Sequence, residues 1–216
     1  MSEIKHERLI VFTRYPEAGK TKTRLIPVLG EQGAADLQRR MTEHLIAKLD
    51  NLLPSRPLSL EIRYEGGDEA LMRSWLGSRF TYHPQPSGHI GQRMRTAFDE
   101  AFESGAQKAI IIGTDIPGIS ADLISNAFDQ LDRHDLVFGP ARDGGYYLIG
   151  IQKKTWSKVN PVLFQKIAWG SAEVLSQTLA TSGKINLQYV LLETLEGDPF
   201  RKVPVFYEEM RKELSL

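Results

Sequence analysis

Cysteine is absent from this 216-residue chain, and it shows neither long apolar runs nor an excess of charge of one sign. Without cysteine there is no disulfide, thiolate zinc site or thiol nucleophile, which fits a reducing compartment. The 27 Lys and Arg residues balance 27 Asp and Glu residues, so no net field favours nucleic acid or an anionic membrane. We therefore expect a cytoplasmic protein with no nucleic-acid partner and no membrane span.

From the histidine spacing and the first residues we expect neither a histidine metal site nor a signal peptide. The five histidines show no ligand-like spacing, so each is better explained as a surface or core residue. The first eight residues, MSEIKHER, are polar and do not resemble a signal peptide. No linker, composition shift or internal repeat divides the chain, and we expect one domain over residues 1–216.

Apolar patterns predict alternating strands and helices. Strands are predicted at 9–13, 58–64, 79–83, 108–113, 135–139, 146–151 and 186–192. Helices are predicted at 31–53, 68–76, 90–104, 121–132 and 171–182. This alternation is typical of an α/β fold with a mainly parallel sheet covered on both faces, and strand 108–113 should lie near its centre. Such a sheet gathers its functional loops at the carboxyl ends of its strands.

Two of the predicted helices show a clear apolar stripe, which predicts the face that each buries. In the first helix the stripe consists of Ala34, Leu37, Met41, Leu45, Leu49 and Leu52. In the third helix it consists of Ile90, Met94, Ala97, Phe98 and Ala101.

The segment after the first predicted strand is rich in cations. Residues 9–25 read LIVFTRYPEAGKTKTRL, and the basic residues are Arg14, Lys20, Lys22 and Arg24. Arginine supplies forked donors, lysine supplies mobile charge, and Gly19 lets backbone N–H groups approach an anion. Together with the hydroxyl of Thr23, these groups favour a polyphosphate site, and a solvated basic loop is the alternative.

The same loop partly matches a P-loop. Residues 19–21 reproduce the end of G-x-x-x-x-G-K-[ST], but Arg14 stands where the first glycine belongs. Pro27 and Gly30 also leave little room for the helix that a P-loop needs after its lysine. A P-loop phosphotransferase is therefore a distant third hypothesis.

An acidic turn follows the predicted central strand. Residues 113–118 read GTDIPG, and Ser120 is better placed than Asp115 to cap the next helix. Pro117 biases the residue before it towards an extended conformation and so stiffens the turn. A rigid carboxylate at this edge is suited to Mg²⁺ or Mn²⁺, which would bridge it to phosphate oxygens.

A second acidic turn, GPARDGGYY, spans residues 139–147. Asp143 can accept from hydroxyl groups or contact a metal, and Gly144 and Gly145 would let a ligand approach bare backbone. The alternative is an ordinary hairpin connection between two apolar strands.

The loop QPSGHIGQRM, residues 85–94, opens the third predicted helix. The amide of Gln85 could read a base edge, and Gly88 would let the backbone approach the ring. Arg93 falls in the first helical turn, where a cation opposes the dipole and needs a counter-anion or an exposed position. A glycine-rich loop with a solvated arginine is the alternative.

In the order of these motifs the chain resembles bacterial radical-SAM/selenodomain-associated transferases, which are similar to glycosyltransferase-A-type nucleotide-diphospho-sugar transferases. More distant relatives are the molybdenum-cofactor and 2-phospholactate guanylyltransferases. The matching stretches are P-x-x-G-x-x-K-T-R-L from Pro16, G-x-x-G-x-R-M from Gly88, G-T-D-x-P from Gly113, G-P-A-x-D-G-G-Y-Y-L-I-G from Gly139 and L-F-x-x-I-x-W-G from Leu163.

This resemblance implies a glycosyltransferase-A-like three-layer sandwich that uses a nucleotide sugar or nucleoside triphosphate and an undefined acceptor. It implies a divalent metal, Mg²⁺ or Mn²⁺, on Asp115, and Asp143 and the glycines after it facing the transferred group. The catalytic side chains would be Asp115, Asp143 and Lys22. The nucleotide would be bound by Arg14, Gly19, Lys20, Lys22, Thr23, Arg24, Gln85, Gly88, Arg93, Gly144 and Gly145.

Two departures from the family pattern bear on catalysis. Ser171 stands where threonine is usual, and the tail LLETLEGDPFRKV replaces a D-x-D-T-like stretch. Glu193 or Asp198 would then supply the second metal-binding carboxylate, or that ligand is missing. The leading hypothesis is metal-dependent transfer from a nucleotide-activated donor, and the family resemblance favours a nucleotide sugar. The alternatives are a nucleotidyltransferase that releases pyrophosphate and a non-catalytic nucleotide-binding accessory protein. The sequence leaves the base, the donor sugar and the oligomeric state undefined.

Overall fold

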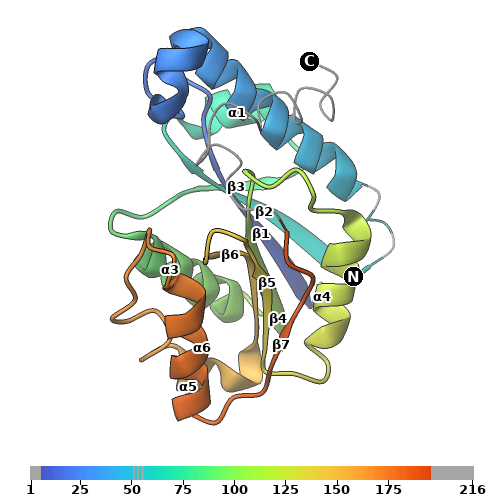
Figure 1. Cartoon of the computed structure of the whole chain (residues 1–216). Coiled ribbons are helices and arrows are strands. Elements are labelled where there is room, and N and C mark those ends of the chain that lie inside the picture. Colours follow the sequence, from blue (N-terminus) through green and yellow to red (C-terminus); the bar gives the residue numbers. More distant parts are fainter. Residues whose placement is uncertain (1–5, 51, 53, 55, 196–216) are drawn as a thin grey trace.

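A computed structural model describes residues 6–50, 52, 54 and 56–195, which form a seven-stranded sheet with helices on both faces (Figure 1). The strands are β1 (Glu7–Arg14), β2 (Leu58–Glu65), β3 (Thr81–Pro84), β4 (Lys108–Gly113), β5 (Leu136–Pro140), β6 (Tyr146–Gln152) and β7 (Tyr189–Leu191). Their order is β3-β2-β1-β4-β6-β5-β7, and within it β6 runs antiparallel to its neighbours. The mainly parallel sheet is therefore confirmed, with β4 at its centre.

The helices are α1 (Ile26–Asp50), α2 (Glu69–Leu76), α3 (Ile90–Glu103), α4 (Ala121–Gln130), α5 (Trp156–Val159) and α6 (Val174–Lys184). Single 3₁₀ turns, η1 (Thr23–Leu25) and η2 (Lys153–Thr155), precede α1 and α5. Ser120 caps α4 as predicted, because its Oγ accepts from the backbone N–H of Leu123 at 3.1 Å. The apolar pattern did not predict the one-turn helix α5. None of the described helices has the length and apolar character needed to cross a bilayer.

Helix α1 starts earlier than the predicted 31–53 and is broken near its beginning. One helical turn from Ile26 joins the long part of the helix at Gly30, whose φ of 71° and ψ of 170° are not helical. Glycine adopts this positive φ without steric cost. Since the long helix begins only after Gly30, no dipole-bearing helix follows Lys20 directly, in agreement with the argument against a P-loop.

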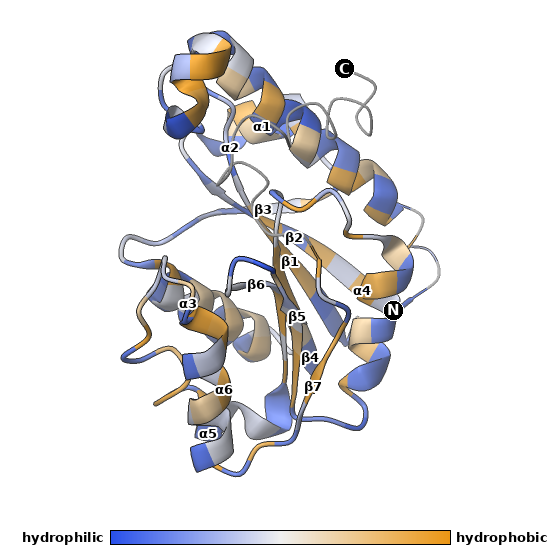
Figure 2. Ribbon diagram, in the orientation of Figure 1, coloured by the Kyte–Doolittle hydropathy of each residue, from blue (hydrophilic) through white to orange (hydrophobic). Residues whose placement is uncertain are grey.

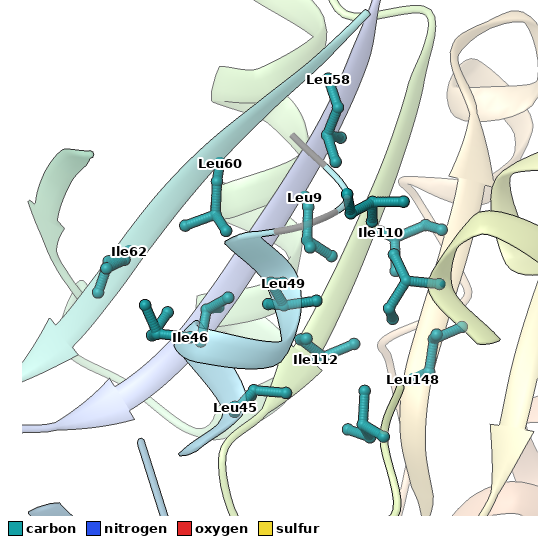
Figure 3. Close-up of a cluster of buried hydrophobic side chains, with 14 of the residues drawn as sticks. Leu9, Leu45, Ile46, Leu49, Leu58, Leu60, Ile62, Ile110, Ile112 and Leu148 are labelled. Atoms are coloured by element: carbon teal, nitrogen blue, oxygen red, sulfur yellow. The ribbon is translucent and has the colours of Figure 1, made fainter. Parts of the chain in front are cut away.

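Alternation along the strands divides the core between two faces of the sheet. From β1, Leu9 and Val11 join one cluster, while Ile10 and Phe12 join the other. Helices α1, α2 and α4 contribute to the first cluster, and α3 and α5 to the second, which α6 also contacts. Figure 2 shows apolar residues along the strands and a mixture of polar and apolar residues along the helices beside them, and Figure 3 shows part of the first cluster.

The predicted apolar stripes are confirmed with one exception. In α1 and just beyond it every stripe residue from Ala34 to Leu52 is buried. In α3 the stripe residues from Met94 to Ala101 are buried, but Ile90 is 40% exposed. Ile90 instead lies on the wall of a cavity at the beginning of α3.

The strand order creates a topological switch point between β1 and β4. From β1 the chain proceeds to β2 and β3 on one side, and then returns to β4 on the other side. The two strands are parallel neighbours and end together, with Phe12 opposite Gly113. Loops that leave such strands in opposite directions open a crevice at their carboxyl ends. The cationic loop and the turn with Asp115 both begin at this crevice.

Candidate functional site

A polar cavity of about 280 Å³ lies at the switch point. It brings together the loop after β1, the beginning of α1 and the turn after β4. Its lining consists of Arg14, Thr21, Lys22, Thr23, Arg24, Leu25, Gln38 and Asp115. The structure therefore places four of the predicted nucleotide-binding residues and the predicted metal ligand around one space, which we call the cationic cavity.

Lys22 and Asp115 are in direct contact in the cationic cavity. Lys22 Nζ lies 2.9 Å from Asp115 Oδ1, and the lysine side chain is 10% exposed against 48% for the aspartate. Lys22 has a left-handed backbone conformation, with φ 46° and ψ 46°. A non-glycine residue in this region is uncommon, and such strain tends to occur at functional sites.

Thr21 holds the turn in which Lys22 lies. Its buried hydroxyl donates to the carbonyl of Tyr15 at 2.9 Å and accepts from the backbone N–H of Glu17 at 3.1 Å. Arg14 adds a link across the same loop, because Nη1 donates to the carbonyl of Lys20 at 2.8 Å. The loop is thus folded back on β1, with the Lys22 side chain directed to Asp115.

Glu65, at the end of β2, connects two arginines from the predicted site. Its carboxylate lies 2.6 Å from Arg14 Nη2 and 3.0 Å from Arg93 Nη1. Burial alone would raise the pKa of Glu65, but the hydrogen bonds and charges of both arginines outweigh it and lower that pKa. Arg93 lies in the first turn of α3, where a cation opposes the helix dipole, and Glu65 is the counter-anion for it.

A buried polar cluster supports both sides of the cationic cavity, and sequence reasoning did not identify it. Gln38 Nε2 lies 3.2 Å from each of the hydroxyl oxygens of Thr13, Thr42 and Thr114. Thr13 and Thr114 directly precede Arg14 and Asp115 in the chain. The sequence did hold a signal for this cluster, because Gln38 and Thr42 are polar residues four apart in a helix with an apolar stripe. Buried polar side chains of this kind need partners, and Thr13 and Thr114 at the ends of β1 and β4 supply them.

The loop that carries Gln85 is held by internal contacts. Gln85 Nε2 donates to the carbonyls of Thr13 and Arg63 at 3.0 and 3.1 Å, and its Oε1 accepts from Arg93 at 3.2 Å. Gly88 has a φ of +116°, and Arg93 Nε donates to its carbonyl at 2.9 Å. Base recognition by Gln85 and Gly88 stays a prediction, and the Gln85 amide already bonds to protein groups at both ends.

The turn with Asp143 connects the antiparallel strands β5 and β6, so the D-G-G motif does form the hairpin connection that was considered as the alternative. Asp143 Oδ1 accepts from the backbone N–H of Gly145 at 3.0 Å. A Cβ on Gly144, at φ +90°, would lie 2.0 Å from the carbonyl oxygen of Ala172, so only glycine fits there. Asp143 and Gly145 nevertheless also line a second cavity.

This second cavity is mainly apolar, also measures about 280 Å³, and lies on the α3 side of the switch point. We call it the apolar cavity. Phe12 and Gly113 in its lining stand two residues before Arg14 and Asp115 of the cationic cavity. Burial raises the pKa of Tyr146, which also lines it, while the Thr178 hydroxyl acts in the opposite direction. Tyr146 is therefore a neutral phenol near neutral pH. Its other walls include Met94, Trp169 and Val174.

Several predicted residues lie outside both linings. Lys20 pairs with Glu17 at 2.7 Å in an exposed position, and the nearest contacts of a Cβ on Gly19 would be with Glu31. Glu193 lies near the hairpin, where its backbone carbonyl accepts from the hydroxyl of Tyr147 at 3.0 Å. Asp198 falls outside the described residues. Their roles at the site stay predictions.

The carboxylates of the described residues do not form a complete metal cage. In that part of the chain there is no group of three or more His, Cys, Asp or Glu side chains around a common point. Asp115 supplies one carboxylate beside a phosphate-sized space. That donor set suits Mg²⁺ or Mn²⁺ held jointly by the protein, water and substrate phosphates, the usual way in which Mg²⁺ binds at nucleotide sites.

Comparisons with known proteins agree with this fold. A family model described as "Uncharacterized protein conserved in bacteria (DUF2064)" matches residues 48–171, more than half of the chain. The matched segment includes Asp115 and Asp143 and begins after the cationic loop. A search of curated proteins found no match.

Solved structures give the more detailed likeness. One is described as a "putative nucleotide-diphospho-sugar transferase" from Desulfovibrio desulfuricans G20, with 29% identity, a TM-score of 0.81 and coverage of 100% of this chain and 96% of that chain. A CMP:2-keto-3-deoxy-manno-octonic acid synthetase complexed with CTP has 9% identity, a TM-score of 0.59 and coverage of 97% and 98%. Rv0371c of Mycobacterium tuberculosis H37Rv, in complex with manganese, has 13% identity, a TM-score of 0.51 and coverage of 97% and 98%.

The likeness at 9% and 13% identity shows a shared fold alone. Taken together, these structures confirm the predicted nucleotide-diphospho-sugar transferase fold. The association with radical-SAM and selenodomain proteins stays a prediction.

Proposed function

This chain belongs to the family described as "Uncharacterized protein conserved in bacteria (DUF2064)", and we propose that it transfers a sugar from a nucleotide-diphospho-sugar to an acceptor. The observation that carries the proposal is the convergence of Arg14, Lys22, Arg24 and Asp115 on one cavity. The structure from Desulfovibrio desulfuricans, described as a "putative nucleotide-diphospho-sugar transferase", and the synthetase complexed with CTP support a nucleotide donor.

The cationic cavity has the charge that a pyrophosphate requires. Arg14 and Arg24 can offer forked N–H donors, and Lys22 offers a point charge on a short, strained turn. Glu65 holds Arg14 from the other side and so limits the rotamers that this long side chain samples. A donor diphosphate would thus meet cations that are already positioned.

Asp115 is the residue that would hold Mg²⁺ or Mn²⁺ together with the donor phosphates. When bound, the metal supplies positive charge to the diphosphate. The manganese complex of Rv0371c supports a divalent ion in this fold. Because Lys22 contacts the same carboxylate, we expect metal and nucleotide to bind together, with Lys22 then turning from Asp115 to a phosphate oxygen.

The protein groups contribute to the chemical step by stabilising the leaving group. Negative charge grows on the diphosphate as its bond to the sugar breaks, and Arg14, Lys22 and Arg24 surround the place where it grows. Loss of one such contact typically costs about 10²–10³ in rate.

We also propose that the chain is one domain over residues 1–216 and acts in the cytoplasm, in keeping with its lack of cysteine.

Nucleotidyl transfer is the second candidate, and the structural likeness to a synthetase complexed with CTP favours it. In that reaction a nucleoside triphosphate would bind in the same cationic cavity, and pyrophosphate would leave. A third possibility, nucleotide binding without turnover, follows from the single carboxylate among the described residues of that cavity.

Product analysis separates these candidates. The full chain is incubated with a panel of nucleotide sugars and nucleoside triphosphates with and without Mn²⁺, and released phosphorus species are followed by ³¹P NMR. The proposal predicts slow, Mn²⁺-dependent release of a nucleoside diphosphate, which Asp115→Asn abolishes and Asp122→Asn, an exposed acid on α4, leaves unchanged. Pyrophosphate release would establish nucleotidyl transfer instead. Metal-dependent binding without product would indicate an accessory protein.

A further inference from the structure

Among the described residues, the lining of the apolar cavity beside the cationic cavity includes no lysine, arginine or histidine, and we propose that this cavity is the acceptor site and selects an uncharged alcohol with an apolar body. This inference rests on the proposed function and names the acceptor class that the function leaves open. Four observations support it: the position of the cavity, its size, its apolar walls and the sign of its charge.

The position of the apolar cavity suits a second substrate. It shares the carboxyl ends of β1 and β4 with the cationic cavity, since Phe12 and Gly113 line the first and Arg14 and Asp115 line the second. Phe12 and Arg14 are two residues apart within β1, so they lie about 6–7 Å from one another. A donor bound through its diphosphate in one cavity would therefore present its reactive carbon near the other.

The size of the cavity sets the size of the acceptor. Its volume of about 280 Å³ is roughly twice that of the apolar cavity of about 150 Å³ which is known in another protein to hold benzene. Two fused rings, or an aliphatic body of similar bulk, would fill it. The walls that such a group would contact include Met94, Ile111, Trp169 and Val174.

Trp169 is tightly packed in the wall of the apolar cavity. Its indole packs on the first turn of α3, where a Cβ on Gly91 would lie 2.4 Å from Trp169 Cζ2. Its ring stacks with that of His89 at a centroid distance of 6.3 Å. Flat aromatic surface fixed in this way favours a ligand with an apolar face.

The described lining of the apolar cavity favours an uncharged acceptor over an anionic one. Among the described residues, its lining contains Asp143 but no lysine, arginine or histidine. An acceptor phosphate would be placed next to a carboxylate in a mainly apolar space, where the desolvation cost is high, and none of the described lining residues offers it a cation. The cavity thus favours transfer to a hydroxyl group over nucleotidyl transfer to a phosphate.

The reaction that follows is a substitution at the anomeric carbon of the donor. The acceptor hydroxyl oxygen forms a bond to that carbon, and the bond from the carbon to the diphosphate oxygen breaks. The electron pair of that bond leaves with the nucleoside diphosphate. The hydroxyl proton passes to the carboxylate of Asp143, which lines the acceptor cavity.

Binding of model acceptors to the full chain tests this inference without any nucleotide. The probe is 2-naphthylmethanol, and its phosphate monoester serves as the anionic counterpart, with both affinities measured by isothermal titration calorimetry. We expect a dissociation constant below about 1 mM for the alcohol and binding at least about tenfold weaker for the ester. Asp143→Asn should narrow the difference between alcohol and ester, because it removes the repelling charge.

Two variants test whether the probe binds in the apolar cavity. Val174→Phe fills the space from α6, and Ile90→Trp narrows it from the beginning of α3, where the partly exposed position of Ile90 accommodates a larger ring more easily. Each should weaken binding of the alcohol at least about tenfold. Ser176→Phe adds the same ring to an exposed position of α6 and is the matched control, with binding within about twofold of wild type.

Unchanged affinity in both folded cavity variants, or an ester that binds as tightly as the alcohol, would overturn the inference. Nucleotide binding and Mn²⁺-dependent donor consumption are measured separately on the same protein preparations. If the donor is consumed but the alcohol neither binds nor accelerates its consumption, the acceptor assignment fails alone. If the alcohol binds but no nucleotide does, the proposed function is wrong and the acceptor role falls with it.

Discussion

Lys22 Nζ lies 2.9 Å from Asp115 Oδ1, although 93 residues separate them in the sequence. The contact joins the loop after β1 to the turn after β4 and places a cation and an anion at the same end of the sheet. On the proposed function, the ammonium group of Lys22 would compete with a metal for the Asp115 carboxylate and would turn to a phosphate oxygen when the metal binds.

Removal of the Lys22 amine should change metal and nucleotide affinity in opposite directions. A hydrogen bond to a charged group contributes about 1.5–3 kcal/mol, so Lys22→Ala should weaken binding of a nucleoside diphosphate with Mn²⁺ about 10- to 100-fold. Affinity for Mn²⁺ alone should rise, because the competing cation is gone. Calorimetric titrations of both ligands check this. Lys154→Ala, at an exposed position of η2, is the control, and parallel losses for both ligands would contradict the competition.

Gln38 should stabilise the protein as well as the site. Its side chain is 4% exposed and its amide lies within hydrogen-bond distance of three buried threonine hydroxyls. Gln38→Leu would leave those hydroxyls with fewer partners and should lower the free energy of unfolding by about 1–3 kcal/mol.

Urea denaturation measures that loss, with Gln32→Leu at an exposed position of the same helix as the control. Nucleotide affinity should also fall, since Thr13 and Thr114 hold the backbone beside Arg14 and Asp115. Equal unfolding free energies for the two variants would show that the cluster contributes nothing.

Glu65 should make stability depend on pH in the acid range. Arg14 and Arg93 lower its pKa below the ordinary 4.5 despite partial burial. A carboxyl whose pKa is lower in the folded state stabilises that state above the unfolded pKa, and the stabilisation is lost as pH falls through the folded pKa. Wild type should therefore exceed Glu65→Gln in unfolding free energy at pH 7. The difference should shrink below about pH 4.5.

Urea titrations at pH 7, 4.5 and 3.5 measure this difference. Glu69→Gln, at an exposed position near the start of α2, is the control. A difference that stays constant over the whole range would mean that the two arginines do not hold Glu65 in its ionised form.

Most of the fold was predictable because its signals are local. Continuous apolar runs identified β1 and β4, and the i, i+3 and i+4 repeats identified α1 and α3 within a few residues. The start of α1 was wrong because a single residue, Gly30, allows a helical turn to join the main helix through a kink. Helix α5 was missed because one turn is too short to show a period.

Less of the site was predictable, because pairing between loops depends on tertiary structure. The convergence of Lys22 and Asp115 was inferred from the order of motifs and from the rule for strand ends. The hydrogen bonds of Gln85 to the protein were not inferred, since the sequence does not indicate which carbonyls a glutamine in a loop will contact. The separation of Asp115 and Asp143 into two cavities was also hidden, because it depends on which side of the β4 end each turn approaches.

The most direct test of the account is calorimetric titration of a nucleoside diphosphate into wild type and Asp115→Asn, each with and without Mn²⁺. The account predicts that Mn²⁺ strengthens binding to wild type at least about tenfold, that this gain disappears in Asp115→Asn, and that the circular dichroism of the two proteins is the same. An equal gain from Mn²⁺ in both proteins would show that Asp115 does not join a metal to the pyrophosphate, and would contradict the proposed site.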